Sequence, residues 1–148
     1  MKTPVNQMKL TIPSCSANEA FARTAVAAFA AQMDPMVEEL ADIKTAVSEA
    51  VTNCIVHAYR EHTGMIWVEC RIYANDRLMI RVRDRGCGIP DVAKAMEPLF
   101  TTGGEERAGL GFAVMQSFMD KLRVTSTPGK GTLVVMEKQL TRKPVRHE

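Results

Sequence analysis

Residues 65–83 read MIWVECRIYANDRLMIRVR, and this stretch decides the fold. Its two halves, 65–73 and 77–83, are rich in Val, Ile and aromatic residues that alternate with polar ones. Such alternation is typical of β-strands with one buried face. The residues between them, Ala74-Asn75-Asp76, favour a turn. The stretch therefore predicts an antiparallel hairpin.

The sequence on either side of this hairpin predicts three more strands. Apolar and polar residues alternate at 8–12, and again at 122–126 and 132–138. The last two segments flank the turn Pro128-Gly129-Lys130-Gly131, which predicts a second hairpin near the end of the chain.

Three segments have the apolar spacing of helices. The first begins after Ser16 or Asn18, the second runs from 36 to about 59, and the third from 108 to 121. The expected buried side of the first helix consists of Phe21, Ala25, Ala28 and Phe29. Because strands and helices do not alternate regularly, we expect an α+β fold. Its form would be a two-layer sandwich, with a mixed, mostly antiparallel sheet and the helices on one face.

Composition limits the number of domains and the kinds of partner. With 148 residues, of which 46% are hydrophobic, we expect a single domain over 1–148, with its core at about 8–138 and a solvated basic tail at 140–148. The net charge of +2 gives no reason to expect direct nucleic-acid binding. No apolar run is long enough for a membrane span, and the polar start is unlike a signal peptide. The four cysteines lack CxxC spacing, which favours reduced thiols and a cytoplasmic location. Cys54 and Cys70 fall in apolar runs, where a reduced thiol acts as a small apolar residue.

A long segment after the first hairpin is poor in regular patterns and is bracketed by paired glycines. It opens with DRGCGIP at 84–90 and closes with GLGF at 109–112. Glycine lets a backbone approach phosphate closely, and the second pair would also open a helix whose free N–H groups attract anions. Turns that need a positive φ are the alternative interpretation. Neither a dinucleotide fingerprint nor a P-loop is present.

A polar stripe lies along the second expected helix. Glu49, Asn53 and His57 are four residues apart and therefore share one face. From spacing alone, a solvated helix side is the favoured explanation, and a packing role is favoured over ligand binding for His57. However, Glu can accept a proton, and the amide oxygen of Asn can bind Mg²⁺, so the stripe is also a candidate catalytic site.

Taken together, these segments resemble the GHKL ATPase superfamily, which has the Bergerat ATP-binding fold. The second helix matches its N box, and the two glycine pairs match its glycine boxes. Within that superfamily, the chain resembles the anti-sigma-F factors of endospore-forming bacteria, which are serine protein kinases, over about residues 8–138. The matching segments are 18–23, 43–53, 97–102, 111–112 and 118–120.

The resemblance implies a role for individual residues. Asp84 would bind the adenine amino group with support from Thr132, Asn53 would hold Mg²⁺, and Glu49 would be the general base. Arg23 would bind protein partners, although a solvated arginine is the alternative. The remaining nucleotide-binding residues implied by the two glycine boxes and the lid are Gly86, Gly88, Ile89, Thr101, Thr102, Arg107, Gly109, Leu110 and Gly111.

The resemblance also implies two activities on one homodimer that binds ATP or ADP. The protein would sequester the RNA polymerase sigma-F factor and phosphorylate a serine of an anti-anti-sigma factor. Alternatives are an anti-sigma kinase of the general stress response, a nucleotide-gated anti-sigma module without kinase activity, and a stand-alone ATPase. Glu49 argues against a mere binding module, because binding needs no base.

Overall fold

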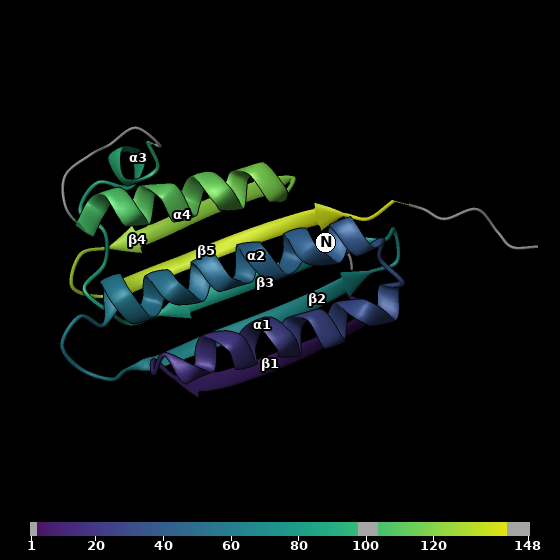
Figure 1. The fold of residues 1–148 in the computed structure, drawn as a ribbon, viewed down its shortest axis with the longest axis horizontal. Coiled ribbons are helices and arrows are strands. Elements are labelled where there is room, and N and C mark those ends of the chain that lie inside the picture. Colours follow the sequence, from purple (N-terminus) through teal and green to yellow (C-terminus); the bar gives the residue numbers. More distant parts are fainter. Residues whose placement is uncertain (1–2, 98–103, 142–148) are drawn as a thin grey trace, which may run out of the picture.

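The computed structural model describes residues 3–97 and 104–141, with side chains omitted at 104–109. Its five-stranded sheet has the order β1-β2-β3-β5-β4 (Figure 1). The strands are β1 (Asn6–Pro13), β2 (Met65–Tyr73), β3 (Arg77–Asp84), β4 (Lys121–Thr127) and β5 (Gly131–Gln139). The expected hairpins are β2–β3 and β4–β5. All four pairings are antiparallel, so the α+β sandwich is confirmed without any parallel pair among the described strands.

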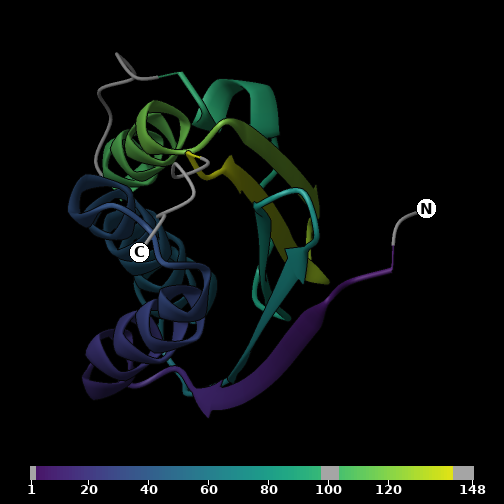
Figure 2. The same ribbon diagram turned by 90° about the vertical axis from the view of Figure 1, so that its right-hand side faces the viewer.

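The helices form the second layer and cover one face of the sheet (Figure 2). They are α1 (Ala17–Ala30), the 3₁₀ turn η1 (Ala31–Met33), α2 (Val37–Asn53), the π turn η2 (Cys54–Ala58), the short α3 (Val92–Ala95) and α4 (Gly104–Phe118). Helix α2 packs between α1 and α4. None of the helices in the described part of the chain is long and apolar enough to cross a bilayer.

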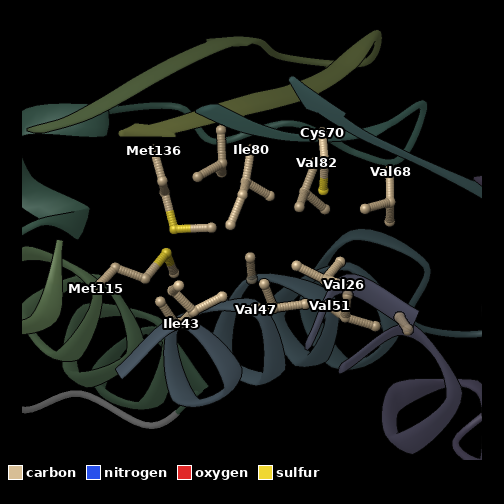
Figure 3. Packing of buried hydrophobic residues seen from close by; sticks show 14 of the residues in the cluster. Val26, Ile43, Val47, Val51, Val68, Cys70, Ile80, Val82, Met115 and Met136 are labelled. Atoms are coloured by element: carbon tan, nitrogen blue, oxygen red, sulfur yellow. The ribbon is translucent and has the colours of Figure 1, made fainter. Parts of the chain in front are cut away.

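The core lies between the two layers, and alternation along the strands fills it. Every second residue of β2 and β3 is buried, and Val68 and Ile80 point toward the helices (Figure 3). Helix α2 contributes Ile43, Val47 and Val51, which are fully buried. The residues between these buried positions are mostly polar, and they lie on the opposite face of the sheet. This division explains why the strand bounds follow so closely from sequence.

The buried side of α1 differs from the predicted one. The structure buries Ala22, Val26 and Ala30, whereas Phe21 is 53% exposed and Ala28 is also exposed. Small residues on the inner side let α1 lie close to α2. Because alanines are spread around this helix, its sequence offers little contrast between faces, and the prediction that Phe21 lies on the buried face is wrong.

Helix α2 offers a matched test of how much this core stabilises the fold. Val47→Ala removes buried methyl groups and should lower the free energy of unfolding by about 2–3 kcal/mol, because a cavity remains. Val37→Ala makes the same change where the side chain is 81% exposed and should cost less than about 0.5 kcal/mol. Urea unfolding of both variants measures the difference. Equal losses would show that Val47 is not part of a packed core.

Candidate active site

A cavity of about 280 Å³ lies between α2, the π turn η2, the loop after β3, and the helices α3 and α4. It brings together residues that are far apart in the sequence. Of the predicted site residues that the structure describes, five line it: Asn53, Asp84, Gly88, Ile89 and Thr132. The helix stripe and the first glycine pair therefore meet in one place, together with the start of β5.

Asp84 is the charged residue buried at this cavity. It is the last residue of β3 and is only 5% exposed. Its Oδ1 accepts hydrogen bonds from the backbone N–H groups of Gly86 (2.9 Å) and Thr132 (3.3 Å). Its Oδ2 accepts from the Cys54 thiol, with Sγ at 3.5 Å. Burial raises the pKa of the Asp84 carboxyl, and these three hydrogen bonds act against that rise.

The Cys54 thiol is the donor in its contact with Asp84. Burial and the nearby Asp84 carboxylate raise the pKa of Cys54 well above its ordinary value, so the thiol stays protonated. A thiol is a weak hydrogen-bond donor. Among the described residues, it is the only donor to Asp84 Oδ2. Oδ2 therefore keeps capacity to accept a second hydrogen bond.

Thr132 contributes both its backbone and its hydroxyl. The Ser126 hydroxyl accepts from the Ile89 N–H (2.8 Å) and donates to the Gly131 carbonyl (3.0 Å). This uses the single proton of the Ser126 hydroxyl. In the 2.8 Å contact between the Ser126 and Thr132 hydroxyls, Thr132 is therefore the donor. The lone pairs of the Thr132 oxygen remain available beside Asp84.

Two glycines let the loop after β3 fit between its neighbours. Gly88 has φ 75°, and a Cβ there would lie 2.3 Å from the Thr127 carbonyl oxygen. Gly86 does not line the cavity but packs behind it, where a Cβ would lie 2.4 Å from the Ala58 carbonyl oxygen. Gly88 therefore fits the interpretation of a turn that needs a positive φ, whereas Gly86 is required by close packing; together they fix the loop that holds Asp84 and Ile89.

Helix α2 presents Glu49 and Asn53 to the neighbouring helix α4. A Cβ at Gly111 would lie 3.1 Å from Glu49 Oε2 and 3.3 Å from the Asn53 amide, so only a residue without a side chain fits easily. Asn53 lines the cavity, and its buried Nδ2 atom has no hydrogen-bond partner among the described residues. Glu49 is half-buried and lies beside the cavity, outside its lining.

The expected continuous helix from 36 to 59 is interrupted directly after Asn53. Residues Cys54–Ala58 form a π turn, in which the Tyr59 N–H donates to the Cys54 carbonyl at 3.1 Å. π turns are frequent at functional sites. The wider turn brings His57 to the cavity, although the sequence favoured a packing role for it.

The second glycine pair does not open a helix. Helix α4 begins at Gly104 instead of 108, so Gly109, Leu110 and Gly111 lie within it and their N–H groups are not terminal. Residues 105–107 are Glu-Glu-Arg, which are good helix formers, so the helix extends toward the N-terminus past the glycines. Leu110 is half-exposed, and Gly111 is buried.

Part of the predicted phosphate cradle cannot be placed. Thr101 and Thr102 lie outside the described residues, and so do the side chain of Arg107 and most of the basic tail. Gly109 is placed only as a backbone position of α4.

Sequence reasoning missed several residues that line the cavity, among them Cys54, Arg60, Cys87 and Lys94. Arg60 follows the π turn, and its Nε donates to the His57 carbonyl at 3.2 Å. Lys94 belongs to α3, which Asp91 caps by accepting from the Lys94 N–H at 3.1 Å. Two cations beside the cavity suit an anionic ligand, but no periodicity or motif marks them in the sequence.

Arg23 lies on α1 and reaches toward α2. Its Nη1 is 3.2 Å from Glu19 Oε1 and 3.4 Å from Ser48 Oγ, and its side chain is 37% exposed. It therefore stands apart from the cavity, at a surface that also exposes Phe21. Both interpretations of this arginine, a solvated side chain and a partner contact, remain compatible with this position.

The residues fit a nucleotide with a magnesium ion. The cavity offers a buried acceptor at Asp84 and an unpaired amide at Asn53, with cations beside it. The described residues contain no group of three or more His, Cys, Asp or Glu side chains that could hold a metal. A metal at Asn53 would thus need most of its ligands from the nucleotide and water, which is the usual situation for Mg²⁺.

Comparison with known proteins identifies the family. A model described as a histidine kinase-like ATPase domain matches residues 12–138. The anti-sigma F factor of Caldanaerobacter subterraneus subsp. tengcongensis is 63% identical over 138 residues, covering 93% of this chain and 96% of that protein. The anti-sigma F factor of Pasteuria penetrans is 56% identical over 137 residues, covering 91% of each.

Solved structures support the fold alone. The RsbU and RsbW domains of a Mycobacterium tuberculosis protein match with a TM-score of 0.68 at 20% identity, over 94% of this chain and 33% of that one. The histidine kinase domain of the Erythrobacter litoralis blue-light activated histidine kinase EL346 gives 0.53 at 22% identity, over 87% and 62%. Because this chain is more than half identical to these two relatives along nearly their whole length, it belongs to the anti-sigma F factor family. The proteins of this family contain a histidine kinase-like ATPase domain, and in this chain that domain spans residues 12–138.

Proposed function

We propose that this chain is an ATP-dependent serine protein kinase and an anti-sigma factor that works as a single domain in a cytoplasmic homodimer. It would sequester the sigma-F factor and phosphorylate a serine of an anti-anti-sigma factor. The observation that carries this proposal is the buried Asp84 carboxylate, with spare acceptor capacity, in one cavity with Asn53 and next to Glu49.

Asp84 would recognise the adenine base. The exocyclic amino group of adenine donates hydrogen bonds, and Asp84 Oδ2 can accept one in addition to the Cys54 thiol. The Thr132 oxygen lies beside it and offers a second acceptor, directly or through water. Ile89 and Gly88 line the same cavity and would contact the base.

The triphosphate would lie toward α2 and α4. Asn53 would hold Mg²⁺, with its amide turned so that the oxygen faces the ion. When bound, Mg²⁺ would neutralise charge that develops on the transferred phosphoryl group. Arg107, Thr101, Thr102 and the 109–111 segment are proposed phosphate contacts by resemblance alone.

Glu49 would accept the proton of the substrate serine. It is one helical turn before Asn53 and outside the cavity lining, so it could face an incoming hydroxyl without contacting the base-binding end. Phosphoryl transfer depends mostly on positioning and charge compensation, and a nearby base adds to the rate.

The protein partners follow from the family. The two relatives compared above are named anti-sigma F factors, which supports sigma-F over the sigma factor of the general stress response. A nucleotide-gated anti-sigma module without kinase activity remains the second candidate. The position of Glu49 beside Asn53 favours the kinase, because binding alone would not require a carboxylate there.

Asp84→Asn should weaken ATP binding by at least roughly 10–100-fold, because an amide NH₂ at Oδ2 would face the adenine amino group. The fold should persist, since the amide oxygen can still accept from Gly86 and Thr132. Titration calorimetry measures the affinity. Asp34→Asn is the control, since it makes the same change outside the cavity at φ 53°, where Asn is well tolerated. Unchanged affinity in Asp84→Asn would remove Asp84 from the site.

Glu49→Gln should lower phosphorylation of the anti-anti-sigma factor by roughly 10²–10⁴-fold, because the amide cannot take up a proton. ATP affinity and sigma-F binding should remain, since neither needs a base. The assay uses labelled ATP with purified candidate anti-anti-sigma proteins. Glu38→Gln repeats the change on the exposed first turn of α2 and should be silent. A fully active Glu49→Gln enzyme contradicts the general-base role, and an inactive wild type favours the binding module.

Arg23→Ala should weaken binding of both sigma-F and the anti-anti-sigma factor by at least about tenfold. The reason is that an arginine can form two hydrogen bonds with one carboxylate of a partner protein. ATP affinity should stay the same, as Arg23 is not at the cavity. Arg123→Ala is the control. It removes the same charge from an exposed position on β4, which is the edge strand at the opposite end of the sheet from β1. If pull-downs show both partners bound as before, their contact surface lies elsewhere.

A further inference from the structure

Cys54 touches the proposed adenine-binding carboxylate from the side of the helices. It is the first residue of the π turn, directly after Asn53, and it is 3% exposed. Its Sγ lies 3.5 Å from Asp84 Oδ2, and Cys54 also lines the cavity. The sequence suggested only a small apolar residue at this position. The structure adds a directed contact to the oxygen that would meet the ligand.

The hydrogen bonds to Asp84 divide unevenly between its two oxygens. Oδ1 receives two backbone N–H groups, from Gly86 and Thr132, and these hold that oxygen in place. They leave some rotation about χ2, which is a broad torsion for Asp and moves both carboxylate oxygens together. Cys54 supplies the third point of attachment, at Oδ2 itself. Hydrogen bonds at both oxygens narrow this rotation, so the Cys54 contact sharpens the direction in which Oδ2 points.

We propose that Cys54 is a positioning residue of the nucleotide site. Its thiol holds Asp84 Oδ2 so that the remaining acceptor direction of this oxygen faces the 6-amino group of the purine. Cys54 thereby adds to the preference for a purine that carries this amino group. The proposal rests on the proposed function, in which Asp84 binds adenine. It concerns orientation, and it assigns no reaction step to the thiol.

A packing role predicts a different pattern of losses. If Cys54 only filled space at the base of the cavity, truncating it would weaken all purine nucleotides alike. A role in orienting Asp84 acts through the 6-amino group alone. The two roles are therefore separated by comparing ATP with purine riboside triphosphate, which lacks the 6-amino group and is otherwise the same ligand.

The experiment measures both affinities by titration calorimetry in four proteins: wild type, Cys54→Ala, Cys54→Ser and Cys70→Ala. Cys54→Ala should weaken ATP binding by about 3–10-fold, the usual effect of one hydrogen bond, and leave the analogue within about twofold. Cys54→Ser keeps a donor and should retain most of the ATP affinity. Cys70→Ala removes the same atoms from a fully buried position on β2, away from Asp84, and should leave both affinities unchanged.

Each outcome decides the question. Equal losses for ATP and the analogue in Cys54→Ala, or no loss of ATP affinity at all, overturn the proposal. Failure of Cys54→Ser to restore ATP affinity, with urea unfolding showing an intact fold, also contradicts it. The proposed function fails separately, if the wild type binds neither ligand or if Asp84→Asn keeps its ATP affinity.

Discussion

The burial of the Asp84 carboxylate is the constraint on which the site depends. A charge in this position is costly unless hydrogen bonds compensate for it, and the backbone around it is arranged to supply them. The loop after β3 turns back so that the Gly86 N–H reaches Oδ1, and β5 begins where the Thr132 N–H can do the same. At Gly131, φ is 130° and a Cβ would lie 2.2 Å from the Asp84 carbonyl oxygen, so β5 can start here only because this residue is glycine. The sheet end and the loop are therefore shaped by one carboxylate.

The transition from α2 to the π turn connects this carboxylate to the helical layer. Cys54 donates to Asp84 at the start of the turn, and the Ala58 carbonyl at its end accepts from the Cys87 N–H at 3.1 Å. Tyr59 follows, and its hydroxyl accepts from the Arg85 N–H and donates to the Met65 carbonyl, both at 2.6 Å. Helix, loop and strand are thus joined by several short contacts on both sides of Asp84. A displacement of the helix end would move the carboxylate with it, and through this coupling a residue of the π turn would influence the proposed base-binding end.

The sequence predicted the strands far better than it predicted the helix ends and faces, and five of the predicted site residues line one cavity. The hairpin 65–83 was located closely because alternation has a period of two, and a strand in the wrong register would put its buried side chains in water. The buried face of α1 was predicted wrongly because its alanines fit either face. The start of α4 was predicted wrongly because the paired glycines lie within the helix and do not begin it. The π turn leaves no mark in a pattern based on 3.6 residues per turn. Cys54 was read as apolar because its neighbours are apolar, and only the folded chain places it beside a carboxylate.

Unused hydrogen-bonding capacity is present where a ligand would bind. Asp84 Oδ2 keeps room for a further donor, and Asn53 Nδ2 is buried without any partner among the described residues. A buried polar group without a partner lowers stability, and such groups are uncommon in packed proteins. The well-filled core beneath α2 can offset this cost, while Gly111 keeps α4 close above the same amide. A ligand that supplies the missing partners would remove the cost and stabilise the fold, so binding and folding of this domain should be thermodynamically linked.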